Sequence, residues 1–238
     1  VVWEWNSHGH LDINHYRLVA SPDWFAGPYN STVMDWTHIN TVRDVPENPW
    51  FEQGDERFKP GNVIISPRQL DTVYIIDRES GDLVWEYSGD YFGGLSGQHE
   101  PYMIPTGYPG EGNIMIFDNG ASPWNDLGHA GMSYVLEVNP TTRELVWVYD
   151  DGLQFHSPYT SSAQRLPNGN TLVCESVTGR VFEVTAEGET VWEYVGCGPR
   201  AYRYGYDYCP QLAAMNRPKE VAVTPPEELH ISPDEPLD

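Results

Sequence analysis

The sequence predicts an all-β fold, a β-propeller whose blades are four-stranded antiparallel sheets. Three observations lead to this prediction. The 238 residues include 9 Trp, 15 Tyr, 22 Gly and 20 Pro, a composition typical of strands joined by tight turns. Short strand-like segments recur along the chain, and they recur in one fixed order. A β-sandwich would not explain why the same order appears three times.

Each repeat contains four segments, taken here in chain order. The innermost strands are expected at residues 37–42, 99–104 and 162–166. A Gly-Asn pair followed by apolar residues gives the second strands, at 61–65, 112–116 and 169–173. The third strands are expected at 73–77, 134–138 and 181–184. Turn-like residues at 78–82 and 186–189 then lead into the fourth strands, as hairpin loops do.

The fourth, outermost strands share a central Val-Trp pair at 83–87, 145–149 and 190–194. Residues 1–5 (Val-Val-Trp-Glu-Trp) are a further copy of this segment, without the inner strands that should precede it. We therefore expect three complete blades plus part of another. Propellers usually have four to eight blades. Residues 1–212 are then expected to be the C-terminal part of a larger propeller, and residues 213–238 a Pro-rich acidic tail.

Another chain or segment, or a homo-oligomer, would have to complete the ring. The charge of the chain argues against nucleic acids and anionic membranes as partners. Asp and Glu outnumber Lys and Arg by 35 to 13, which gives a formal net charge of −22. A nucleic-acid or anionic membrane surface attracts an excess of basic residues, so neither is an expected partner. No apolar run approaches the ~18–20 residues that cross a bilayer.

Three histidines are the main candidates for chemistry. His38 and His99 lie near the start of two innermost strands, at positions that the repeat makes equivalent, and His156 lies in the loop before the third. Innermost strands line the channel of a propeller, so we expect the three imidazoles to surround one pocket. An imidazole there could attack a phosphoryl or sulfuryl group, bind a metal, or bind an oxyanion. The alternative is that each ring only bonds a neighbouring carbonyl.

Other polar residues are weaker candidates. Arg68 follows a strand end and could hold a sulfate-like group, although a salt bridge is an equal alternative. His8, His10 and His15 are close in sequence, but their spacing fits no specific zinc pattern, and neither a metal nor another cofactor is expected.

The chain has three cysteines. Cys197 and Cys209 flank a Tyr-rich loop and are a plausible disulfide in an oxidising compartment, whereas Cys174 is expected to be buried in a strand.

Several longer stretches resemble the arylsulfotransferase-like (aryl-sulfate sulfotransferase) propeller family. They are Asp-Trp-Thr-His-Ile-Asn at 35–40, Ile-Ser-Pro-Arg at 65–68, Gly-Gln-His at 97–99, Phe-Asp-Asn-Gly at 117–120 and the run at 161–172. With residues 1–5 and 200–203, the resemblance covers nearly the whole of residues 1–212. It implies a six-bladed, secreted or periplasmic propeller. It also implies transfer of a sulfuryl group from an aryl sulfate to a phenol through a sulfohistidine, without a nucleotide donor.

The resemblance also assigns roles to residues. His38 and His99 match active-site positions, the region of His156 resembles the segment that approaches the nucleophile, and Asn119 joins Arg68 as a candidate for substrate binding. The sequence departs from the family pattern at one position that affects charge. The family commonly continues after Asn-Gly to a Gly-Arg, whereas Ala121 follows Gly120 here.

The leading hypothesis is a sulfuryl transferase in which His156 attacks sulfur while His38 and His99 protonate the leaving phenolate and steady the oxygens. The missing Gly-Arg favours an alternative, a non-catalytic extracellular propeller that serves as a binding or assembly module. A metal-dependent enzyme is a third hypothesis.

Overall fold

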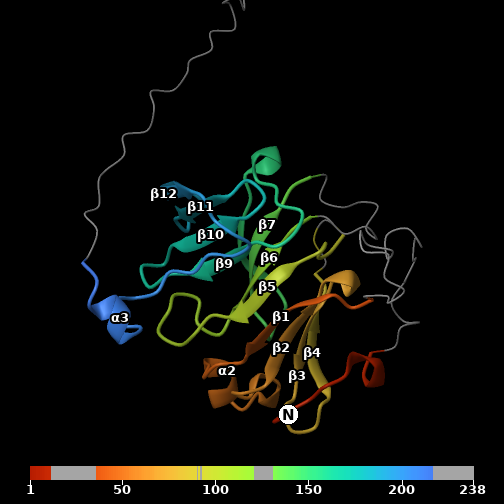
Figure 1. Ribbon diagram of the computed structural model, residues 1–238. Helices are drawn as coiled ribbons and strands as arrows, with labels where there is room; N and C mark the ends of the chain where they lie inside the picture. Colours follow the sequence, from red (N-terminus) through yellow and green to blue (C-terminus); the bar gives the residue numbers. More distant parts are fainter. Residues whose placement is uncertain (12–35, 90, 92, 121–130, 217–238) are drawn as a thin grey trace, which may run out of the picture. The chain divides into compact units, whose positions relative to one another are not determined.

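The computed structural model describes residues 1–11, 36–89, 91, 93–120 and 131–216, and these form three four-stranded antiparallel sheets (Figure 1). In every sheet the strands lie side by side in the order in which they follow along the chain. The predicted all-β fold is confirmed, and the three sheets correspond to the three predicted blades.

The blades have closely similar strand lengths. The first contains β1 (Ile39–Asp44), β2 (Val63–Pro67), β3 (Val73–Ile76) and β4 (Leu83–Tyr87). The second contains β5 (His99–Met103), β6 (Ile114–Asp118), β7 (Tyr134–Val138) and β8 (Leu145–Tyr149). The third contains β9 (Ser162–Arg165), β10 (Thr171–Glu175), β11 (Arg180–Val184) and β12 (Thr190–Val195).

Helices are short and lie in the connections. The α-helices are α2 (Pro49–Glu52) and α3 (Pro210–Ala213), and the 3-10 turns are Ser7–Gly9, Glu56–Phe58, Arg68–Leu70 and Gly152–Gln154. Helix α2 begins where it does because Asn48 caps it, its side-chain oxygen accepting a hydrogen bond from Phe51 N at 3.0 Å. Among the described residues, no helix has the length and the apolar character that crossing a membrane requires.

The recurring Gly-Asn pair closes the turn between the first and second strands of each blade. Gly61, Gly112 and Gly169 have φ values of 89°, 81° and 91°, which side chains rarely adopt. The N–H of Gly112 also donates to Ile104 O at 2.9 Å, which closes the turn. A Cβ at Gly112 would lie only 2.7 Å from Trp50 Nε1. The repeat therefore conserves glycine for a backbone reason.

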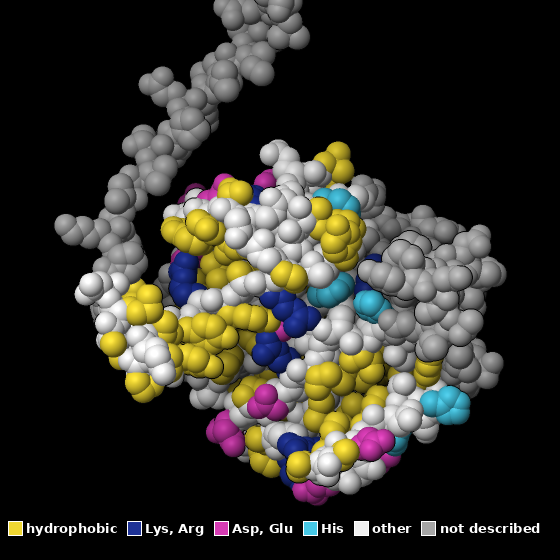
Figure 2. All heavy atoms as spheres, viewed as in Figure 1, with side chains coloured by type: hydrophobic (Ala, Val, Ile, Leu, Met, Phe, Trp, Pro, Cys, Tyr) yellow, Lys and Arg dark blue, Asp and Glu magenta, His cyan; other side chains and the backbone are white. Residues whose placement is uncertain are grey.

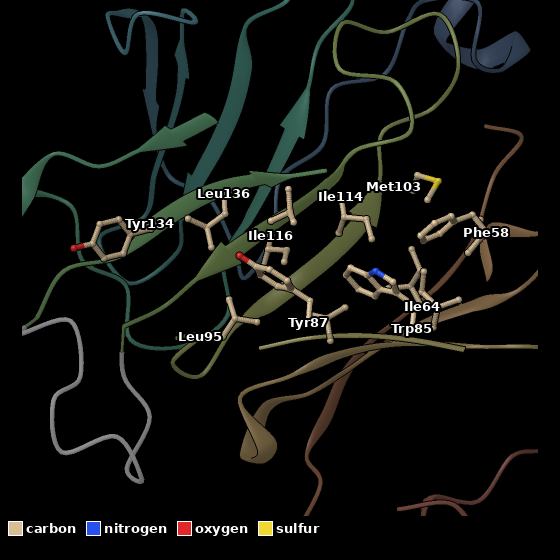
Figure 3. Close-up of a cluster of buried hydrophobic side chains, with 14 residues drawn as sticks. Phe58, Ile64, Trp85, Tyr87, Leu95, Met103, Ile114, Ile116, Tyr134 and Leu136 are labelled. Carbon is tan, nitrogen blue, oxygen red and sulfur yellow. The ribbon is translucent and has the colours of Figure 1, made fainter. Parts of the chain in front are cut away.

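Apolar side chains fill the spaces between neighbouring blades. Between the first and second blades, Ile64 and Trp85 pack with Met103, Ile114 and Leu136 (Figure 3). A second cluster joins the second and third blades through residues that include Phe117, Phe155, Val173 and Phe182. Two-sided burial explains why the second and third strands read as continuous apolar runs.

The tryptophans of the outermost strands form hydrogen bonds from blade to blade. Trp85 Nε1 in the first blade donates to Pro140 O in a turn of the second blade, at 2.7 Å. Trp147 Nε1 in the second blade donates to Ala186 O in a turn of the third, at 2.8 Å. Trp5 Nε1 donates to Gly81 O of the first blade at 2.9 Å, so the N-terminal segment takes the place of a preceding outermost strand.

Among the described residues, the series of tryptophan hydrogen bonds between blades stops at the third blade. Trp192 of β12 is 44% exposed, and no carbonyl of the described residues accepts a hydrogen bond from its Nε1. Every residue of β12 is exposed.

The chain divides into two compact units, Val1–Arg203 and Tyr204–Asp238. The blades belong to the first unit. In the second unit the described residues include α3 and the packed rings of Tyr204 and Tyr208, whose centroids are 4.3 Å apart. The expected boundary between residues 212 and 213, the acidic tail beyond it and the total number of blades stay predictions.

Candidate active site

One register position recurs at the ends of the second strands. Directly after β2 comes Arg68, directly after β6 comes Asn119, and directly after β10 comes Ser176. Arg68 and Asn119 are buried, although both are polar. Buried polar side chains are retained where they make specific interactions. The polar groups around Asn119 are organised about His99.

His99 is the most buried of the described histidines, with 4% of its surface exposed. Its Nδ1 lies 3.0 Å from Gly97 O and 2.7 Å from Asn119 Oδ1, and both of these atoms accept hydrogen bonds. The Asn119 amide nitrogen donates to Ser157 O at 2.6 Å and to Thr160 O at 3.0 Å, which fixes the orientation of the amide. Nδ1 must therefore carry the proton.

The other ring nitrogen of His99 keeps its lone pair. Thr160 N–H donates to His99 Nε2 at 3.2 Å, so Nε2 accepts a hydrogen bond. The pKa of His99 is lowered from 6.5 to about 4, chiefly by burial and in smaller part by electrostatic interaction with Arg68 and His38. The hydrogen bonds with Asn119 and Gly97 raise the pKa and offset only part of this effect. His99 is thus a neutral imidazole at physiological pH, with Nε2 as its basic atom.

The lowered pKa of His99 predicts how the free energy of unfolding depends on pH. Between about pH 6.5 and pH 4 the unfolded chain binds a proton at His99 that the folded chain does not. The free energy of unfolding is therefore expected to fall by about 3 kcal/mol, on account of this group, as the pH is lowered through that window. Urea unfolding of wild type and His99→Asn at about pH 7 and about pH 4.5 measures the difference. Parallel pH dependences of the two proteins would contradict the assignment.

His38 and Arg68 lie close enough to His99 for their charges to act on it. His38 is exposed, just before β1, and has a positive φ of 46°. Its carbonyl accepts a hydrogen bond from Arg68 N at 3.1 Å, which links the start of the innermost strand to the end of the second. Burial of the guanidinium lowers the pKa of Arg68, and Asp71 offsets this in part. On the face of the molecule seen in Figure 2, histidine side chains lie beside Lys and Arg side chains.

The strand register corrects one premise of the sequence analysis. Ile39, the residue after His38, pairs with the last residue of β2, whereas His99 pairs with the last residue but one of β6. His38 and His99 are therefore not equivalent positions of the repeat. Both innermost strands carry a bulge near this point, which the sequence did not reveal. Because both strands carry this bulge, it does not cause the offset between the two histidines, and the electrostatic effect of His38 still reaches His99.

The family assignment follows from comparison with known proteins. The sequence model of the arylsulfotransferase (ASST) family matches residues 1–196, more than four fifths of the chain. The chain belongs to the arylsulfotransferase family. No curated protein shows significant similarity to it.

One similar solved structure is that of a Bacteroides caccae protein of unknown function, with 19% identity and a TM-score of 0.41. The match covers 58% of this arylsulfotransferase-family chain and 43% of the other, so the chain spans less than half of that protein's length.

His156, the third candidate, reaches the site of this arylsulfotransferase-family chain through its backbone. Its N–H donates to Glu175 Oε1 at 3.1 Å, and the next carbonyl, of Ser157, accepts from Asn119. The imidazole Nδ1 is buried and has no hydrogen-bond partner among the described residues. Nor does any hydrogen bond in this part of the chain join the ring to His99. The attack on sulfur that the sequence assigns to His156 stays a prediction.

A group of hydroxyls that the sequence analysis missed holds the backbone of Thr160. Ser161 Oγ donates to Ser157 Oγ at 2.9 Å and lies 3.1 Å from Ser176 Oγ, and the Thr160 hydroxyl bonds to the same Ser176. Thr160 and Ser161 have φ values of 57° and 81°, a conformation unusual for residues with side chains. The hydroxyl network holds this turn so that Thr160 N–H points at His99 Nε2. The only sequence signal was the density of Ser and Thr in residues 157–162.

Three other arginines, Arg43, Arg165 and Arg200, are engaged in ion pairs. Arg43 and Arg200 both pair with the buried carboxylate of Glu100, which also accepts from Tyr202 OH at 2.6 Å. Arg165 pairs with Glu137 of the neighbouring blade. Arg68 is the arginine whose charge acts on His99. Its assignment as a candidate for anion binding stays a prediction.

The predicted Cys197–Cys209 disulfide is absent from the structure, in which all three cysteines are free thiols. Cys197 instead lies against Cys174 of β10, with 3.1 Å between the sulfur atoms. Cys174 is buried, as expected from its place in a strand.

Within the described ranges, no three His, Cys, Asp or Glu side chains form a group that could hold a metal ion. His10 stacks on Trp5 with ring centroids 5.0 Å apart, and His15 lies outside the described residues.

Proposed function

We propose that this chain transfers a sulfuryl group from an aryl sulfate to a phenol, with His99 Nε2 as the atom that carries the group. One observation supports this most strongly. His99 is a buried neutral imidazole whose Nδ1 proton is held by Asn119, so its lone pair lies on Nε2. A fixed tautomer with an unprotonated nitrogen is what a nucleophilic histidine needs. The geometry thus favours His99 over His156 for the attack.

The first half-reaction forms a sulfohistidine. Nε2 attacks the sulfur of the aryl sulfate, the N–S bond forms, and the S–O bond to the aryl group breaks. The leaving phenolate takes the electron pair and receives a proton from His38, which acts as the general acid. The positive charge that develops on the His99 ring is stabilised because Nδ1–H donates to Asn119 Oδ1.

The second half-reaction restores the enzyme. An acceptor phenol gives its proton to His38 while its oxygen attacks sulfur. The N–S bond then breaks and its electron pair returns to Nε2. Because each half-reaction uses the same nitrogen, the donor product must leave before the acceptor reacts.

Two groups would stabilise the sulfuryl oxygens. The Arg68 guanidinium supplies positive charge near His99. Thr160 N–H bonds to Nε2 in the free enzyme. Because this hydrogen bond occupies the Nε2 lone pair, the Thr160 turn must move aside before Nε2 can bond to sulfur. The released N–H could then donate to a sulfuryl oxygen. Together with Arg68 it would act in place of the arginine missing after Gly120.

Intact-mass analysis tests the proposal. After brief incubation with an aryl sulfate, the chain is expected to gain one sulfuryl group, to carry it on the peptide that contains His99, and to lose it when a phenol is added. His8→Ala is the matched control, because His8 is exposed and should not change the yield. An adduct mapped to His156, or the absence of any adduct in protein that is folded, would contradict the role of His99.

A second candidate function is a binding or assembly module. The exposed apolar residues of β12 favour it, since Val191, Trp192, Tyr194 and Val195 are all open to solvent. A partner that contacts this strand would protect Trp192 from chemical modification. The secreted or periplasmic location is part of the same proposal and follows only from the family resemblance.

A further inference from the structure

We propose that Cys174 and Cys197 form an intramolecular disulfide that ties the outermost strand of the third blade to its second strand. Cys174 lies in β10 and is completely buried, and Cys197 comes two residues after the end of β12. Their sulfur atoms are 3.1 Å apart. The two thiols are thus in contact before any covalent bond exists.

The strand pairing brings the two cysteines together across β11. Cys174 pairs with Val181 near the start of β11, on one side of that strand. On the other side, Cys197 N–H donates to Gly179 O, at 3.0 Å, just before β11 begins. Both sulfurs therefore lie at the same end of β11. Their other polar contacts are carbonyl oxygens, Gly198 O at 3.5 Å from Cys174 and Arg180 O at 3.7 Å from Cys197. Cys197 also packs against the apolar cluster that contains Cys174.

The bond would add a covalent link to an exposed edge of the sheet. The β12 strand is exposed along its whole length. Beyond Cys197 the chain returns to the innermost strand, where Pro199 O accepts from Ser161 N at 2.9 Å and Ala201 N donates to Ser162 Oγ at 3.1 Å. A cross-link at Cys197 would therefore fix both the outer edge of the blade and the segment that packs beside β9.

Oxidation balances with a small disulfide, such as oxidised glutathione, as the oxidant. The thiolate of Cys197, which is only partly buried, attacks one sulfur of the oxidant and releases one glutathione thiol. The thiolate of Cys174 then attacks Cys197 in this mixed disulfide and releases the second. The protein loses two protons and two electrons, and the oxidant is reduced to two thiols. Burial raises the pKa of Cys174, which is why Cys197 reacts first.

Peptide mapping of the full chain after incubation with oxidised glutathione tests the proposal. The expected result is one cross-linked peptide pair containing Cys174 and Cys197, with one titratable thiol left, that of Cys209. The oxidised chain should melt roughly 5–10 °C higher than the reduced chain, as expected for a loop of this length.

Two variants separate the alternatives. Cys209→Ser is expected to keep both the cross-link and the increase in Tm, whereas Cys197→Ser loses both. A cross-linked peptide that contains Cys209, a stable glutathione adduct on Cys197, or three free thiols after oxidation would each overturn the proposal. Mapping of the wild-type chain decides the question even where Cys197→Ser lowers stability.

Discussion

Replacing His99 by Asn is expected to reduce sulfuryl transfer by about 10⁴-fold or more while leaving the fold intact. The loss is large because a nucleophile has no substitute in a covalent mechanism. The fold should survive because the Asn side-chain nitrogen falls close to the position of imidazole Nδ1. It can still donate to Gly97 O and Asn119 Oδ1, the two acceptors of wild type. Steady-state turnover of a chromogenic aryl sulfate measures the effect.

Two companion variants make the result specific. His156→Asn, whose parent ring makes no hydrogen bond with the described residues, is expected to reduce turnover far less, and His8→Ala not at all. A thermal melt of each variant shows whether it is folded. The role of His99 is wrong if His99→Asn keeps more than about a tenth of wild-type turnover while His156→Asn abolishes it.

Replacing Glu137 by Leu is expected to lower the free energy of unfolding by about 3–5 kcal/mol. Glu137 and Arg165 belong to neighbouring blades, and their side chains are each only 6% exposed. Removing one partner leaves the other charge buried and uncompensated, which is the costly case. Asn113 also loses its acceptor, because its amide donates to Glu137 Oε1 at 2.7 Å. Urea denaturation at neutral pH measures the loss.

The double variant Glu137→Leu/Arg165→Met tests the cause. Because it removes both charges, it should recover most of the stability that Glu137→Leu loses. Glu79→Ala is the control for a surface pair, since Glu79 is largely exposed beside Lys59, and its loss should be at most about 1 kcal/mol. A double variant no more stable than Glu137→Leu would show that packing rather than charge dominates this interface.

The sequence predicted the outer strands and two of the three innermost strands well, and the first innermost strand less well. Residues 83–87 and 145–149 are the observed strands β4 and β8, because a Trp in an apolar run marks each one. The expected strand at 37–42 is instead Ile39–Asp44. Residues 37 and 38 lie outside the strand, and His38 has a positive φ of 46°, which no residue pattern indicated.

The same distinction holds for the candidate site. Side-chain chemistry marked His99 and Arg68 in the sequence, and the family resemblance added Asn119. Their roles in binding and catalysis stay predictions. Thr160 could not, because it contributes a backbone N–H that any residue type would supply. The neighbour of Cys197 was predicted wrongly for a related reason. Proximity along the chain favoured Cys209, whereas the pairing of three strands places Cys174 beside it.

The tryptophan hydrogen bonds between blades imply a direction of cooperativity. Each indole anchors its own sheet to the hairpin of the one that follows, so the molecule behaves as a linear array with nearest-neighbour coupling. In such an array the central member is supported from both sides, and the ends are supported from one. The third sheet, whose Trp192 anchors to no described carbonyl, is therefore the place where local opening starts.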